Sequence, residues 1–270
     1  MAQKKVSDIK IININAGHTK ANGNAPGAVG ILNESTEARN VKNKVVTMLR
    51  ILGKTVNDCT VDDAMDANNC LDKIVKLSNS HKADLFISIH LNSGANDKNG
   101  NGKTTGVEVF TMPNSTVTSI AEDVCSEIAK LGFKNRGVKT SPQWYVVRKT
   151  DASAMLIECC FVDDKDDAEL FDSTKMAEAI VKAVTGKTYK YGTEQQVSSS
   201  PTVNKTFESY VVRITASVLN VRKGPSTKYD IVTTVKKNDA YTIVEEMDGW
   251  GRLKSDAGWI SLAYTERIKY

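Results

Sequence analysis

Two different spacings of apolar residues alternate along the first 190 residues of the chain. Short apolar and β-branched runs, typical of buried strands, occur at residues 9–14, 85–89, 107–110, 145–147 and 154–157. Between them, apolar residues recur at helical spacing, as in Val41, Val45 and Leu49, Ile120, Val124 and Ile128, and Met176, Ile180 and Val184. Because alternating strands and helices form sheets covered by helices, we predict an α/β domain with a central, mostly parallel sheet flanked by helices.

The pattern changes at residues 193–205, TEQQVSSSPTVNK, which are rich in Ser, Gln and Thr. This segment lacks apolar periodicity, so we interpret it as a linker. Six short strand-like runs separated by turn residues follow it, at residues 210–214, 218–221, 231–235, 241–245, 250–253 and 258–261. The sequence therefore predicts a first domain at residues 1–192 and a small all-β barrel at residues 206–270.

The bulk composition excludes several classes of function. The formal net charge is +4 and no dense run of Lys and Arg occurs, so nucleic acid is not an expected partner. No apolar run approaches the roughly 18 residues of a membrane helix, so we expect no membrane insertion. The N-terminal MAQKKVSDIK lacks the apolar segment of a secretory signal. The five cysteines form no CxxC pair, so we expect reduced, mostly buried thiols.

Three ionisable residues stand at the ends of predicted strands. His18 follows IKIININAG, His90 closes LFISIH and Glu158 closes AMLIE. In open α/β sheets, functional groups gather beyond the carboxyl ends of the strands, so we expect these side chains at one edge of the sheet. Two histidines and one glutamate form a known catalytic zinc set that leaves a position open for water. The pattern indicates metal-assisted amide hydrolysis.

His18 and His90 supply the two histidines of this set, and the third ligand, a glutamate, has two candidates on the helix predicted before Val41. Glu34 lies on the same helical face as Val41, Val45 and Leu49, which is expected to pack on the sheet, whereas Glu37 is rotated further towards solvent. We therefore favour Glu34.

The sequence leaves alternative roles open for several of these residues and their neighbours. Glu158 has Arg148 and Lys149 as possible partners in a structural ion pair, and Cys159 or Cys160 beside it is a possible thiol nucleophile. The third histidine, His81, is expected at the surface. Asn92 is expected either to orient a substrate or to cap a turn.

Four motifs carry a resemblance to a known family: NAGH at 15–18, ILNE at 31–34, SIHLNS at 88–93 and LIECCFVDD at 156–164. Together they resemble the zinc-dependent N-acetylmuramoyl-L-alanine amidases, often called amidase type 3, over roughly residues 9–185. The resemblance implies that His18, Glu34 and His90 bind zinc and that Glu158 is catalytic. The chain departs from the family pattern around the ligands, at Asn15, Thr19, Lys20 and Asp164.

The second domain resembles bacterial SH3-type domains over residues 216–268. The matching pieces are LNVRKGPST at 219–227, DGW at 248–250 and GWISLAY at 258–264. Such modules bind cell-wall peptides, and the aromatic residues expected to line a binding groove are Trp250, Trp259, Tyr229 and Tyr264. At least one of the two tryptophans is expected in the core instead.

Together the two resemblances imply a peptidoglycan hydrolase. It would cleave the amide between N-acetylmuramic acid and the L-alanine of the stem peptide by zinc-activated water, with Glu158 moving the proton. A phage or prophage endolysin, made in the cytoplasm and released through a holin, is the favoured biological role. The alternatives are a zinc peptidase acting on the stem peptide, a sporulation autolysin and a non-catalytic wall-binding protein. The sequence does not indicate an oligomeric state.

Overall fold

The computed structural model describes residues 2–191, 209–222, 224–225, 227, 229–247, 249–255 and 257–268. The chain divides into two compact units, residues 1–194 and 195–270. The predicted linker at 193–205 lies outside the described residues, so its interpretation as a linker stays a prediction. Within the described residues, no helix is long and apolar enough to cross a membrane.

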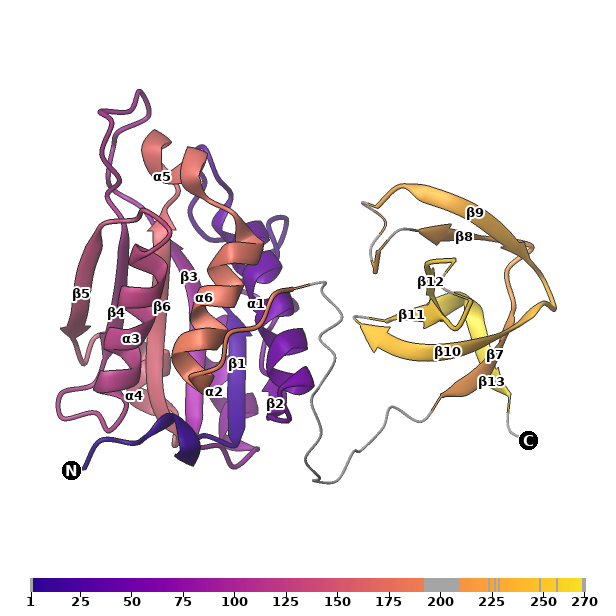
Figure 1. Ribbon diagram of the computed structural model, residues 1–270, viewed down its shortest axis with the longest axis horizontal. Coiled ribbons are helices and arrows are strands. Elements are labelled where there is room, and N and C mark those ends of the chain that lie inside the picture. Colours follow the sequence, from indigo (N-terminus) through magenta and orange to yellow (C-terminus); the bar gives the residue numbers. More distant parts are fainter. Residues whose placement is uncertain are drawn as a thin grey trace. The chain divides into compact units, whose positions relative to one another are not determined.

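The first unit is built on one six-stranded sheet with the order β2-β1-β3-β6-β4-β5 (Figure 1). Its strands are β1 (Ile11–Ala16), β2 (Thr55–Asp58), β3 (Leu85–Asn92), β4 (Val107–Thr111), β5 (Asn135–Thr140) and β6 (Ser153–Phe161). Every neighbouring pair is parallel except β4 and β6, which are antiparallel. The structure therefore confirms the predicted mostly parallel sheet.

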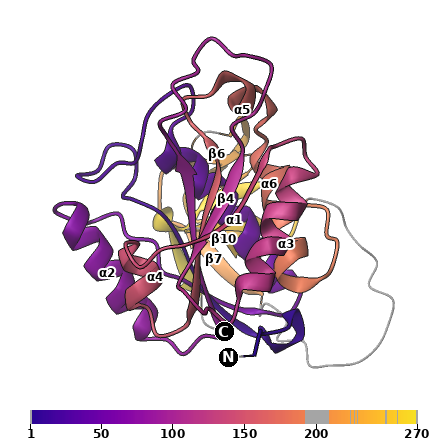
Figure 2. The same ribbon diagram turned by 90° about the vertical axis from the view of Figure 1, so that its left-hand side faces the viewer.

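Helices cover both faces of this sheet (Figure 2). They are α1 (Glu34–Ile51), α2 (Ala67–Asn79), α3 (Thr118–Ala129), α4 (Tyr145–Lys149), α5 (Lys165–Leu170) and α6 (Ser173–Thr185), and a short 3-10 helix, η1 (Val6–Asp8), precedes β1. The apolar faces of α1, α3 and α6 pack on one side of the sheet with Ile87, Ile89 and Val109. The smaller apolar cluster on the other side joins α2 and α4 to Phe86 and Leu156.

The predicted strand at residues 145–147 is wrong, because these residues form α4. Val146 and Val147 are β-branched, but both are buried against α2 residues such as Ile74. Secondary-structure propensities are weak compared with the burial of apolar side chains, so tertiary packing decides the conformation of so short a segment.

The strands β2 and β5 were not predicted, because both lie at the edges of the sheet and carry few apolar residues. The strands that hold His90 and Glu158 are also longer than predicted. β3 continues to Asn92 and β6 continues to Phe161, so neither residue closes its strand. The apolar core beneath them extends the pairing, because Leu91 and Cys159 are buried in it.

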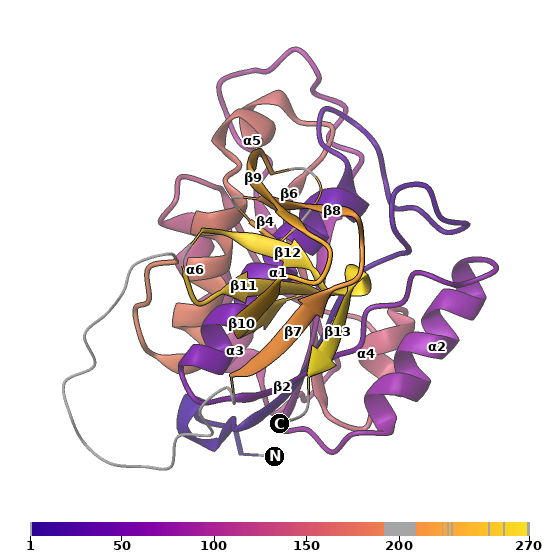
Figure 3. The same ribbon diagram turned by 90° about the vertical axis from the view of Figure 1, so that its right-hand side faces the viewer.

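The second unit is an antiparallel sheet with the strand order β13-β7-β10-β11-β12-β8-β9 (Figure 3). Its strands are β7 (Tyr210–Ile214), β8 (Val218–Arg222), β9 (Ile231–Lys236), β10 (Ala240–Met247), β11 (Trp250–Leu253), β12 (Trp259–Ser261) and β13 (Thr265–Ile268), and η2 (Leu262–Tyr264) precedes the last strand. All six predicted strands are present, and β13 is additional. Ile214 near one end of the strand order and Val235 at the other share a single core, so the sheet curls around its apolar side chains.

Candidate metal centre and active site

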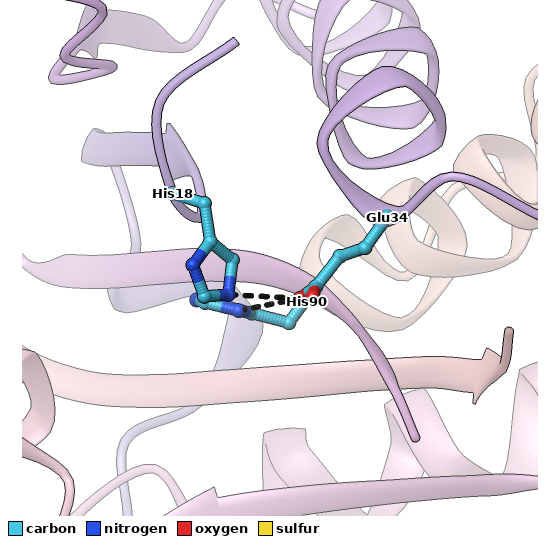
Figure 4. A group of neighbouring side chains, drawn as sticks. All are labelled: His18, Glu34 and His90. Carbon is cyan, nitrogen blue, oxygen red and sulfur yellow. Dashed lines mark hydrogen bonds and ion pairs between the residues drawn. The ribbon is translucent and has the colours of Figure 1, made fainter. Parts of the chain in front are cut away.

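The structure brings His18, Glu34 and His90 together at one point (Figure 4). His18 follows β1, Glu34 begins α1 and His90 lies on β3. Oε1 of Glu34 lies 3.2 Å from Nε2 of His18 and 3.0 Å from Nδ1 of His90. The three ligand atoms lie within 4.8 Å of one another. Two imidazole nitrogens and one carboxylate oxygen at this spacing form a donor set that could hold a metal ion.

The loop after β1 aims the His18 ring at this point. His18 adopts a left-handed backbone conformation with φ of 62°, which is uncommon for a residue other than glycine. Arg39 of α1 holds this turn, because its guanidinium donates to the carbonyl oxygens of Gly17 and His18 and pairs with Asp62. A Cβ on Gly17 would lie 2.0 Å from the His90 ring, so only glycine lets the loop approach His90 this closely.

Glu34 owes its position to the start of α1. The side chain of Asn33 caps the helix by accepting a hydrogen bond from the backbone N–H of Thr36. The buried Glu34 carboxylate then accepts hydrogen bonds from the N–H groups of Ala28 (2.7 Å) and Leu91 (3.3 Å). Glu37, the other candidate, instead accepts a hydrogen bond from the side chain of Asn40 and is not part of the cluster.

The electrostatics of the cluster suit a cation. Burial alone would raise the pKa of Glu34, but the hydrogen bonds of His18 and His90, together with the charges that these rings carry when protonated, outweigh it and hold this pKa well below its usual range. Burial lowers the pKa of His90, against the opposing effect of Glu34. The carboxylate is therefore charged and the buried imidazole neutral near pH 7, which is the form in which both bind metal.

Glu158 lies directly beside this cluster on the neighbouring strand. Its Cα pairs with that of His90 across β3 and β6, so both side chains leave the same face of the sheet. The Glu158 side chain is buried, and its Oε2 atom has no hydrogen-bond partner within the described part of the chain. Burial raises its pKa well above the usual value, and the charges of Glu34 and Glu108 raise it further.

The two alternative roles near Glu158 lack support. No ion pair joins Glu158 to Arg148 or Lys149 among the described residues, since Arg148 donates instead to the carbonyl of Pro142. All five cysteines are free and buried, as predicted, and burial raises the pKa of the Cys159 and Cys160 thiols. Such thiols are poor nucleophiles, because the reactive form is the thiolate. His81 is exposed, as predicted.

Sequence reasoning missed Glu108 of β4, whose Cα pairs with Glu158 on the side opposite His90. Glu108 is buried and accepts hydrogen bonds from the Asn92 side chain, from Arg136 and from Lys139. Its only sequence signal is an acidic residue within the apolar strand VEVF, which is costly unless partnered. Asn92 is held at both ends of its amide, because its oxygen accepts from the N–H of Ser93.

The four aromatic residues singled out in the second unit differ in exposure. Tyr229 and Tyr264 are about half exposed, at 47% and 54%, and Trp250 is intermediate. Trp259 is only 9% exposed, and its neighbour Ile260 belongs to the core of the unit. The side chains available at the surface are therefore those of the two tyrosines and, in part, Trp250.

Comparison with known proteins matches each of the two units to a protein family. Residues 12–187 match the family model described as N-acetylmuramoyl-L-alanine amidase, and residues 217–266 match the bacterial SH3 domain. The first match covers more than half of the chain. The chain therefore belongs to the N-acetylmuramoyl-L-alanine amidase family, a class of cell-wall hydrolases, and carries a bacterial SH3 domain as its second unit.

The chain is also similar to individual relatives and to solved structures. The endolysin of Bacillus phage SPP1 is 26% identical, and the match covers 73% of this chain and 74% of that protein. The sporulation-specific N-acetylmuramoyl-L-alanine amidase of Bacillus subtilis is 27% identical over 63% of each chain. The catalytic domain of the CD27L endolysin targeting Clostridia difficile aligns with a TM-score of 0.59 and 27% identity, and covers 67% of this chain and 99% of that domain.

Proposed function

We propose that the chain hydrolyses the amide between N-acetylmuramic acid and the L-alanine of the stem peptide in peptidoglycan. In this proposal His18, Glu34 and His90 hold a zinc ion and Glu158 is the catalytic acid and base. One observation carries it: three metal-binding atoms converge within 4.8 Å, directly beside a buried carboxylate with an unpartnered oxygen. Zinc bound there would lower the pKa of a bound water and polarise the scissile carbonyl.

Each residue of the chain has a separate task in this reaction. Glu158 takes a proton from the attacking water and delivers it to the leaving amine of L-alanine. Glu34 stays ionised and supplies the negative charge of the ligand set. Ser88 orients the His90 ring, because its Oγ lies 3.0 Å from Nε2 of His90 and leaves Nδ1 facing Glu34. Arg39 holds the His18 turn and thereby fixes the second imidazole.

The test of the reaction is mass spectrometry of the fragments released from purified peptidoglycan. We expect intact stem peptides that begin with a free L-alanine, together with glycan strands that have lost their peptides. Stem peptides cut between amino acids would instead show the alternative activity, a zinc peptidase. The absence of any released fragment would favour the other alternative, a non-catalytic wall-binding protein.

We further propose that the enzyme acts as a phage or prophage endolysin that reaches the wall through a holin. The support is the match to the SPP1 endolysin, which covers more of this chain than the match to the sporulation-specific amidase. Hydrolysis of purified walls from vegetative cells by the chain would support this role. Activity confined to walls of sporulating mother cells would support the autolysin instead.

Removal of the second unit should weaken activity on intact walls more than on small soluble muropeptides. We propose domains at residues 1–192 and 206–270 with a linker at 193–205, and all four proposed site residues lie in the first. A tethered wall-binding domain raises the effective concentration of the catalytic domain near an insoluble substrate without changing the chemistry. The measurement compares both substrates for the full chain and for residues 1–192.

The same experiment has a clear opposite outcome. Equal losses on both substrates would point to a catalytic or folding role for the second domain. If isolated residues 206–270 do not sediment with purified walls, the targeting role of Tyr229, Trp250 and Tyr264 is wrong. Mild proteolysis is expected to cut first within 193–205, because a segment of this composition cannot bury apolar surface.

A further inference from the structure

A group of charged side chains beside the active site has no task in the reaction described above. Glu108 is 3% exposed and lies on β4, next to Glu158 on β6. Arg136 and Lys139 of the edge strand β5 both pair with its Oε2 atom, and the distance from Nε of Arg136 is 2.7 Å. Two cations thus share one carboxylate, which leaves one positive charge in excess.

The Arg136 guanidinium is held in place, yet only some of its hydrogen-bond donors are used. Its Nε atom donates to Glu108, and the group lies 5.0 Å from the centre of the Phe161 ring. Within the described residues, nothing accepts a hydrogen bond from its two terminal amino groups, and 28% of the side chain is exposed. Lys139 is 43% exposed. A fixed guanidinium with free donors and a nearby ammonium is suited to bind a carboxylate.

The position of this group relates it to the substrate. Neighbouring strands lie about 4.8 Å apart, so the Glu108 carboxylate and the cations on it begin one strand spacing from Glu158. An extended peptide advances about 3.5 Å per residue, so a chain leaving the scissile bond in this direction reaches the cations within about two residues. In this direction the L-alanine is the first of them, and the residue after it is the one that would reach Arg136.

We propose that Arg136 and Lys139 form a binding subsite for a free carboxylate on the stem-peptide residue that follows L-alanine. This inference rests on the proposed amidase reaction, because that reaction sets where the peptide begins. Glu108 is the positioning residue of the subsite, since it holds both cations and the Asn92 side chain. The enzyme should therefore discriminate between stems in which this carboxylate is free and stems in which it is amidated.

The test uses two soluble muramoyl tripeptides whose second residue is a glutamate joined to the third through its γ-carboxyl, and they differ only in the α-carboxylate of that residue, which is free in one and amidated in the other. A charge-assisted hydrogen bond at a partly exposed site contributes about 1.4 kcal/mol, which corresponds to about tenfold. We expect the wild-type full chain to prefer the acid by about tenfold in kcat/KM. Arg136→Gln should remove most of this preference, with Lys139 left as the remaining cation, whereas Lys134→Gln, which removes a neighbouring exposed positive charge, should leave it unchanged.

A second measurement separates this inference from the amidase proposal. The peptides that lack the muramoyl group are not substrates, and their binding can be followed by calorimetry in wild type and Arg136→Gln. Tighter binding of the acid that depends on Arg136 supports the subsite even if no hydrolysis occurs. Equal binding and equal cleavage of acid and amide by the wild type would overturn it, as would an equal loss on both peptides in Arg136→Gln.

Discussion

Replacing Glu158 with glutamine should lower kcat on a soluble muropeptide by about 10²–10⁴-fold, because a positioned general base contributes about that much. Glutamine keeps the shape of the side chain but cannot accept the proton. The fold should be unaffected, because Glu158 makes no hydrogen bond through Oε2 that the substitution would break. Circular dichroism and metal analysis check that the variant is folded and loaded.

Cys159→Ala is the matched control for this variant. It removes the neighbouring thiol, which lies in the apolar core on the opposite face of β6, and should leave turnover nearly unchanged. Wild-type turnover by Glu158→Gln would remove Glu158 from the mechanism. Loss of turnover in Cys159→Ala, with the fold intact, would revive the thiol nucleophile.

The pH dependence of activity is a second test of the role of Glu158. Burial, the largest cause, raises the pKa of Glu158, and a general base acts only when ionised. Activity should therefore rise with pH through this raised pKa, with an acid limb above the value of about 4.3 typical of an exposed glutamate. The residual activity of Glu158→Gln should lack that limb.

Replacing Glu34 with alanine should remove the metal. We expect about one zinc per wild-type chain, since three protein ligands with an open fourth position are the catalytic pattern. Glu34→Ala should retain almost none after dialysis, and His18→Ala and His90→Ala should behave alike, because each loses one of three ligand atoms. Elemental analysis of the dialysed proteins measures the content.

Glu37→Ala is the control, because Glu37 lies one turn further along the helix and contacts Asn40 rather than the histidines. It should keep its zinc. Metal retained in Glu34→Ala but lost in Glu37→Ala would mean that the wrong glutamate was chosen. A chelator should abolish hydrolysis and added zinc should restore it, and full activity of demonstrably metal-free protein would end the zinc proposal.

Much of the architecture followed from the sequence. The alternation of strand and helix spacing indicated an α/β domain, because each spacing is the period at which one face of an element meets a core. The six short runs after residue 209 correctly indicated strands for the same reason. Periodicity failed where burial is slight, as in β2 and β5, and where three apolar residues fit either element, as in α4.

The sequence by itself also indicated that His18, Glu34 and His90 would meet, because the ends of parallel strands share one edge of a sheet and Glu34 lies on the helical face that packs on it. Only the tertiary structure decided how they meet. The pairing of β3 with β6 sets His90 beside Glu158, and the pairing of β6 with β4 adds Glu108. Arg136 joins that row from a polar edge strand, 28 residues after Glu108 in the sequence. No local pattern reveals this, because strand order depends on contacts that the whole chain makes together.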